Sequence, residues 1–131
     1  MNKQEMVKIL NDLELNRQGC ELVMGSALLM YGIRKDAHDV DIAVTNELFE
    51  EYLKRGYSIE CNTWGRERIL IIVNGIEIEL FRETLAEVES QEFEGFYVQT
   101  LDSILKWKKM LGREKDLKDI KVIEEYMAKN K

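Results

Sequence analysis

Two aspartates stand one residue apart in an apolar segment of the chain, the run Asp39-Val40-Asp41. If this segment is a strand, alternation puts both carboxylates on one face and Val40, Ile42 and Val44 on the other. Two neighbouring carboxylates in an apolar setting repel each other and lose hydration. A divalent cation removes that penalty, and hard oxygen ligands suit magnesium. The spacing therefore predicts a metal-binding face on this strand.

The pair Gly25-Ser26 precedes these aspartates, where a short apolar segment passes into a predicted short helix. Backbone N–H groups at such a junction can hold a phosphate. A phosphate-binding turn beside metal-binding carboxylates is typical of phosphoryl and nucleotidyl transfer.

A second pair of carboxylates, Glu77 and Glu79, alternates with apolar residues after the Asn74-Gly75 dipeptide. Asn-Gly between two apolar runs is the strongest short hairpin signal. The two glutamates share one face of the predicted second strand. Taken alone, that face is either solvated or part of the acidic site, and the alternation does not choose between these.

Lys108 interrupts the apolar stripe of a predicted helix formed by Leu101, Ile104, Leu105 and Leu111. An apolar residue would be expected at this position. Either the lysine stem crosses the edge of the core towards solvent, or its ammonium reaches an anionic site. Its neighbours Arg113 and Lys115 are weaker candidates for the same anion, and Asp116 and Asp119 are expected to be surface charges or partners of nearby bases.

The order of these motifs resembles the nucleotidyltransferase superfamily that is named after DNA polymerase β. Gly25-Ser26 and Asp39-Val40-Asp41 match its first two motifs, and residues 108–120 resemble the C-terminal signature of small bacterial members. Those members include minimal nucleotidyltransferases and relatives of abortive-infection toxins. One local departure precedes the first aspartate: relatives often carry an arginine and a threonine there, whereas this chain has Arg34-Lys35-Asp36-Ala37-His38.

The resemblance implies a third metal-binding carboxylate on a strand beside the aspartates, and the Glu-Leu-Phe ending selects Glu79 over Glu77. Asp39, Asp41 and Glu79 would then hold Mg²⁺ or Mn²⁺. The resemblance also implies that Gly25 and Ser26 hold the phosphates of a nucleoside triphosphate such as ATP, and that Lys108 contacts the triphosphate.

The function that the resemblance implies is transfer of a nucleoside monophosphate to an acceptor hydroxyl with release of pyrophosphate. A small molecule, a tRNA or a protein could supply that hydroxyl, and a homodimer or a partner protein could complete the site. The alternative is a non-catalytic nucleotide-binding or toxin–antitoxin component that keeps the fold. The sequence assigns no role to Glu77, Arg113, His38 or Trp64.

Length and composition agree with one domain over residues 1–131. The chain carries a net charge of −6; residues 106–131 hold 9 basic against 5 acidic side chains, and residues 1–105 hold 10 against 20. The acidic bulk disfavours nonspecific binding to a nucleic-acid backbone. No apolar run reaches the roughly 18 residues of a membrane span, no secretory segment is recognised, and Cys20 and Cys61 are expected to be free thiols in the cytoplasm.

Periodicity and turn signals predict an α+β unit in which a small mixed sheet is flanked by helices. An N-terminal helix belongs to residues 1–19, the sheet core with the active site to 20–98, and a C-terminal helical pair to 99–131. The expected helices are 3–16, 26–31, 47–55 after a Thr45 or Asn46 cap, 100–111 and 113–127. The expected strands are 21–24, 40–44, 57–61, 68–73, 76–81 and 96–98.

Overall fold

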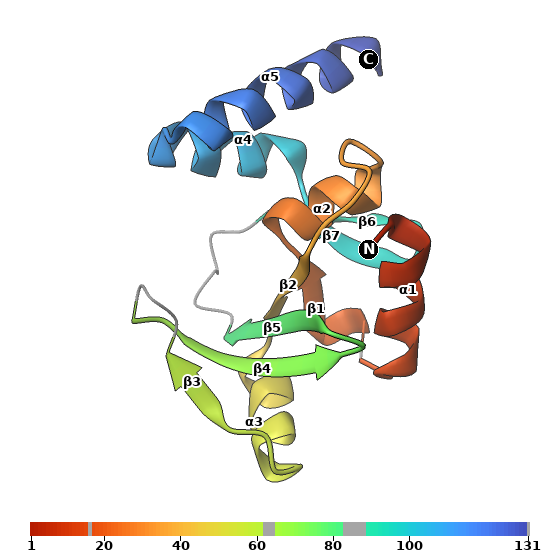
Figure 1. Cartoon of the computed structure of the whole chain (residues 1–131), viewed down its shortest axis with the longest axis vertical. Helices are drawn as coiled ribbons and strands as arrows, with labels where there is room; N and C mark the ends of the chain where they lie inside the picture. Colours follow the sequence, from red (N-terminus) through yellow and green to blue (C-terminus); the bar gives the residue numbers. More distant parts are fainter. Residues whose placement is uncertain (16, 62–64, 83–88, 131) are drawn as a thin grey trace.

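The computed structural model describes residues 1–15, 17–61, 65–82 and 89–130. Its centre is a seven-stranded mixed sheet in the order β3-β4-β5-β2-β1-β7-β6 (Figure 1). The strands are β1 (Cys20–Leu22), β2 (Asp39–Val44), β3 (Ile59–Cys61), β4 (Glu67–Val73), β5 (Ile76–Arg82), β6 (Ser90–Phe93) and β7 (Phe96–Gln99). The helices are α1 (Lys3–Asp12), α2 (Met24–Tyr31), α3 (Asn46–Lys54), α4 (Leu101–Leu111) and α5 (Glu114–Lys129), with a 3₁₀ turn at Arg17–Gly19. The expected mixed sheet flanked by helices is confirmed.

The strand β2 lies at the middle of the sheet, and one of its faces is apolar whereas the other is polar. Val40, Ile42 and Val44 are at most 1% exposed and belong to the core, which also includes Met6 of α1 and Phe49 of α3. Asp39 and Asp41 alternate with these residues and therefore face the opposite side of the sheet. The core thus fixes which way the two aspartates point.

The hairpin between β4 and β5 forms at Asn74 and Gly75, as predicted. Both residues have positive φ, 52° and 78°, which is the left-handed backbone that the two central residues of a type I′ turn require. This turn sets the antiparallel register of β4 with β5. The parallel pairing of β5 with β2 then brings the predicted glutamates next to the aspartates.

The C-terminal helical pair, α4 and α5, lies together at one end of the molecule near α2 (Figure 1). Thr100 caps α4 by accepting a hydrogen bond from the N–H of Ser103, and Gly112, with a φ of 59°, separates the two helices. Both features were predicted. On α5, Ile123 is fully buried, whereas Leu117 is 59% exposed, so the predicted apolar side of this helix is only partly covered.

The N-terminal third differs from expectation at two boundaries. The first helix ends at Asp12 rather than at residue 16, because the chain turns at Glu14, whose φ is 52°. The second helix begins at Met24 rather than at Ser26, and β1 ends at Leu22. Gly25 and Ser26 therefore lie within the first turn of α2 and not in a turn that precedes it.

The strand β6 was not predicted. It pairs antiparallel with β7 through a turn at Glu94 and Gly95, both with positive φ. Its sequence, Ser-Gln-Glu-Phe, is mostly polar, so no apolar alternation marks it. Among the helices of the described residues, none combines the length and apolar character needed to cross a membrane.

Candidate active site

The carboxylates of β2 and β5 lie opposite one another on the polar face of the sheet. Because the two strands are parallel and in register, Glu77 pairs with Asp39, and Glu79 pairs with Asp41. Neighbouring strands are about 4.8 Å apart, so the four residues lie side by side on this face of the sheet. Glu77 is exposed, whereas Glu79 is partly buried, and Glu79 is therefore the glutamate that lies deeper beside Asp41.

Asp41 lies in an environment that disfavours its charged form. Burial, reinforced by the neighbouring charge of Asp39, raises the pKa of Asp41 from 3.8 to about 6. The positive charges of Arg68, Arg34 and Arg66 oppose this rise without cancelling it. A raised carboxylate pKa means that the fold holds negative charge at a net free-energy cost. This cost is what a bound cation would relieve.

Glu79 is ion-paired in this structure, a feature that the sequence did not indicate. Its carboxylate accepts a hydrogen bond from the guanidinium of Arg68 on β4. The β4–β5 register pairs Arg68 with Phe81, so Arg68 reaches Glu79 as a diagonal neighbour on the same face. Arg68 also lies 3.9 Å from Glu60 of β3.

The donor chemistry of this patch fits a hard divalent cation, since Asp39, Asp41 and Glu79 supply carboxylate oxygens on one face. These three carboxylates do not, however, form a complete set of metal ligands in this structure. Within residues 1–15, 17–61, 65–82 and 89–130, no three His, Cys, Asp or Glu side chains converge as a ready metal site. Glu79 would have to exchange Arg68 for the cation to complete the set.

The predicted phosphate-binding residues lie at the junction of β1 and α2, directly beside Asp41. Ser26 is 1% exposed, and its hydroxyl oxygen accepts a 2.8 Å hydrogen bond from the backbone N–H of Asp41. The N–H of Ser26 donates to the carbonyl of Val23, and that of Met24 donates to the side chain of Gln99. The hydroxyl of Ser26 thus ties α2 to β2, and its phosphate role stays a prediction.

Gly25 leaves room for the guanidinium group of Arg34 at the junction of β1 and α2. A Cβ atom at this position would lie only 2.7 Å from Nη1 of Arg34, so the absence of a side chain lets the guanidinium lie against the first turn of α2. Arg34 is close enough to Asp41 to lower its pKa. Arg34, from the run that precedes the first aspartate, therefore lies near Asp41.

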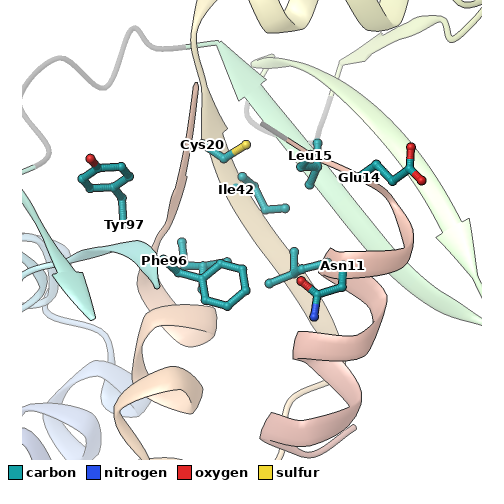
Figure 2. Close-up of a pocket in the computed structure, with 9 residues that line it drawn as sticks. Asn11, Glu14, Leu15, Cys20, Ile42, Phe96 and Tyr97 are labelled. Carbon is teal, nitrogen blue, oxygen red and sulfur yellow. The ribbon is translucent and has the colours of Figure 1, made fainter. Parts of the chain in front are cut away.

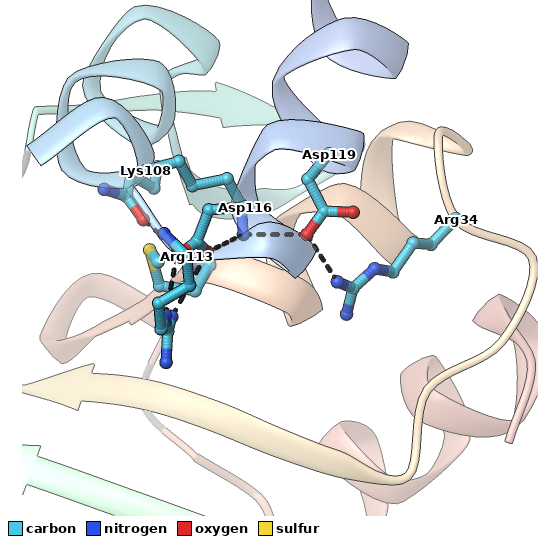
Figure 3. A network of polar contacts seen from close by, with 7 residues as sticks. Arg34, Lys108, Arg113, Asp116 and Asp119 are labelled. Atoms are coloured by element: carbon cyan, nitrogen blue, oxygen red, sulfur yellow. Dashed lines mark hydrogen bonds and ion pairs between the residues drawn. The ribbon is translucent and has the colours of Figure 1, made fainter. Parts of the chain in front are cut away.

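Arg34 also joins a network of charges that reaches α4 and α5 (Figure 3). The carboxylate of Asp119 lies 2.8 Å from Nη2 of Arg34 and 2.9 Å from Nζ of Lys108. Asp116, which is fully buried, lies 3.6 Å from the same ammonium and 2.6 Å from Nε of Arg113. The hydrogen bond from Arg113 lowers the pKa of Asp116 to about 2, so this carboxylate stays charged.

Lys108 is 4% exposed, so its side chain does not extend from the apolar stripe of α4 into solvent. Its ammonium contacts the protein's own carboxylates, Asp116 and Asp119 of α5. These two acids are thus partners of nearby bases, which was one of the two alternatives for them. Contact between Lys108 and a triphosphate stays a prediction, and it would require the ammonium to leave this network.

A cavity of about 250 Å³ opens between the acidic face and α4. Its polar walls are Asp41, Glu79, Arg66 and Gln99. Its apolar walls are Val23, Met24, Phe81, Trp107 and Leu111. The sequence analysis missed Arg66, Phe81 and Trp107. Phe81 could have been found from alternation, because it shares the face of Glu79, whereas no sequence signal places Trp107 at this cavity.

Four further charged or titratable residues named in the sequence analysis do not line this cavity. His38, Glu77 and Lys115 are exposed, and Arg113 caps α5 through Asp116. Trp64 lies outside the described residues.

A second cavity, of about 210 Å³, lies on the other face of the sheet and is lined by Cys20, Ile42 and Phe96 (Figure 2). Ile42 points away from the acidic face because it alternates with Asp41. Burial raises the pKa of the Cys20 thiol to about 12, so this thiol stays protonated and is a poor nucleophile. Neither Cys20 nor Cys61 forms a disulfide bond, as predicted. The charged chemistry is therefore concentrated at the cavity of Asp41.

Comparison with known proteins supports the fold class. No protein-family model matches the chain, and no curated protein sequence matches it. Among solved structures, the chain is similar to a Thermotoga maritima protein that is described as a candidate nucleotidyltransferase, with a TM-score of 0.63 over 98% of this chain and 96% of that one. The sequence identity is 14%, so the similarity establishes the fold alone. The chain has a nucleotidyltransferase-like fold.

Proposed function

We propose that this chain is a metal-dependent nucleotidyltransferase that moves a nucleoside monophosphate from a nucleoside triphosphate to an acceptor hydroxyl. The observation that carries the proposal is the pairing of Asp41 with Glu79 inside one cavity, beside the start of α2. Asp39 adds a third carboxylate on the same face. The nucleotidyltransferase-like fold supports this function in general terms.

The charged groups that line the cavity or lie beside it have defined roles in this proposal. Asp39, Asp41 and Glu79 would hold Mg²⁺ or Mn²⁺, which would supply Lewis-acid stabilisation of phosphate charge. The guanidinium groups of Arg34 and Arg66, which both act on Asp41, would place positive charge beside the phosphates.

The transfer itself is an in-line displacement at the α-phosphorus. The acceptor oxygen forms a new bond to this phosphorus, while the bond to the oxygen that bridges the α- and β-phosphates breaks. Pyrophosphate leaves with that electron pair, and one of the three carboxylates takes the hydroxyl proton. The acceptor could be a small molecule, a tRNA or a protein hydroxyl.

A second candidate function is nucleotide binding without turnover. The ion pair between Arg68 and Glu79 favours it, because it engages the carboxylate that would complete the metal site. In the catalytic proposal this pair opens when nucleotide and metal bind; in the non-catalytic one it persists.

The experiment that tests the proposal is incubation with magnesium, each α-labelled nucleoside triphosphate and a panel of acceptors. Labelled adducts are then identified by mass, and pyrophosphate is measured. We expect an acceptor whose mass rises by one nucleoside monophosphate with the wild type but not with Asp39→Asn. Nucleotide binding without any adduct or pyrophosphate would support the non-catalytic function, and absence of both binding and turnover would refute both.

A further inference from the structure

Trp107 occupies the edge of α4 that faces the acidic cavity. Ile104, Leu105 and Lys108 form the buried side of this helix, whereas Trp107 is only partly buried and lines the cavity. Leu111 follows one helical turn later and lines the same cavity. The helix therefore presents an indole and an aliphatic side chain to a space whose opposite side carries carboxylates.

The opposite wall supplies a second aromatic ring. Phe81 follows Glu79 by two residues on β5 and shares its face. Two residues of strand advance by about 6.6 Å, which is comparable to the span of a ribose between its base and its phosphate. The guanidinium of Arg66 lies 4.8 Å from the centre of the Phe81 ring. The cavity thus passes from charge at Asp41 and Glu79 to aromatic surface over the length of one sugar.

We propose, on the basis of the proposed function, that Trp107 stacks on the nucleobase of the bound nucleotide and that stacking area sets base preference. The volume of about 250 Å³ lies just below the roughly 300–1,000 Å³ of drug-sized ligand pockets. It suits the nucleoside half of a nucleotide whose phosphates extend along the carboxylates. Purine nucleotides then bind more tightly than pyrimidine nucleotides, because the larger ring system covers more of the indole.

Gln99, a polar residue that lines the cavity, is already engaged in the fold. The side-chain oxygen of Gln99 accepts the N–H of Met24, and its amide nitrogen donates to Ser103, both at 2.9 Å. This amide holds the junction of β1 and α2 to the start of α4. Recognition of the base therefore rests on its flat surface, which every base offers.

The test measures binding of ATP, CTP and inorganic tripolyphosphate, each with magnesium, to the wild type, Trp107→Ala, Trp107→Phe and Met110→Ala. Met110 lies on the same helix and is 66% exposed, so it is the matched control. We expect ATP to bind about 10-fold more weakly to Trp107→Ala, with CTP losing less and tripolyphosphate unchanged. Trp107→Phe should stay within about 3-fold of the wild type, because a ring is kept.

A fluorescence measurement tests the same inference while the indole ring of Trp107 stays in place. The chain has two tryptophans, Trp64 and Trp107. The substitution Trp64→Phe therefore leaves Trp107 as the single indole. ATP should quench its fluorescence, and tripolyphosphate should not.

Two results would overturn the base pocket while leaving the proposed function intact: wild-type ATP affinity in Trp107→Ala, or equal losses for ATP and tripolyphosphate. A wild type that binds none of the three probes would overturn both.

Discussion

Replacing Asp41 by asparagine should stabilise the protein at neutral pH while removing its proposed metal-dependent function. Asp41 is held at a pKa of about 6 instead of 3.8 by burial and by the charge of Asp39. A carboxyl whose pKa is raised by folding destabilises the folded state when it is ionised. The penalty is absent below about pH 4, grows as pH rises towards 6, and is complete above the folded-state pKa.

The magnitude follows from the shift, because each unit corresponds to 1.36 kcal/mol. The rise of the Asp41 pKa from 3.8 to about 6 gives about 3 kcal/mol as an upper figure for the stabilisation in Asp41→Asn at pH 8. Urea unfolding of the wild type and the variant at pH 4 and pH 8 measures it directly. The free energies of unfolding should nearly coincide at pH 4 and diverge at pH 8.

The matched control is Asp36→Asn, which changes an exposed aspartate in the loop before β2. It should alter the free energy of unfolding by less than about 0.5 kcal/mol at both pH values. Magnesium with nucleotide should stabilise the wild type by mass action and leave Asp41→Asn unchanged. A variant that is less stable than the wild type at pH 8, or a difference that does not depend on pH, would refute the reasoning.

Three further substitutions test other parts of the site. Lys108→Ala should lower the free energy of unfolding by about 3 kcal/mol in urea titrations, because it leaves two α5 carboxylates without their buried partner. Lys109→Ala, on the exposed side of α4, should change this free energy by under about 0.5 kcal/mol. Equal effects of the two substitutions would show that only general charge matters. Ser26→Ala should cost about 1–3 kcal/mol by leaving a buried backbone N–H of β2 unpaired, and an unchanged unfolding midpoint would refute this tie. Gly25→Ala should displace the guanidinium of Arg34 and weaken nucleotide binding by about 10-fold in titration calorimetry. The free energy of unfolding should change by under about 1 kcal/mol. Unaltered nucleotide affinity would show that Arg34 is not part of the site.

The sequence predicted those parts of the fold that depend on local signals. Alternating apolar residues marked β2 and β5, the Asn74-Gly75 pair marked the hairpin, and Thr45 and Thr100 marked two helix starts. The same alternation put Asp39 with Asp41 on one face of β2, and Glu77 with Glu79 on one face of β5. Each of these features is encoded within a few residues of the chain.

The features that escaped prediction depend on contacts between distant segments. The pairing of Arg68 with Glu79 follows from the register of two strands, and residue types alone do not fix which cation is the diagonal neighbour. The burial of Asp116 depends on how α5 packs on Lys108. The place of Trp107 at the cavity depends on how α4 lies relative to β5.

The most direct test of the central claim is equilibrium binding of ATP to the wild type and to Asp39→Asn/Asp41→Asn, each with magnesium and with a chelator. The acidic cavity is the proposed metal-dependent nucleotide site, so the wild type should bind ATP with magnesium and lose most of this affinity with the chelator. The double variant should bind weakly under both conditions. Equal affinity of the wild type with and without metal, or wild-type affinity in the double variant, would contradict the account.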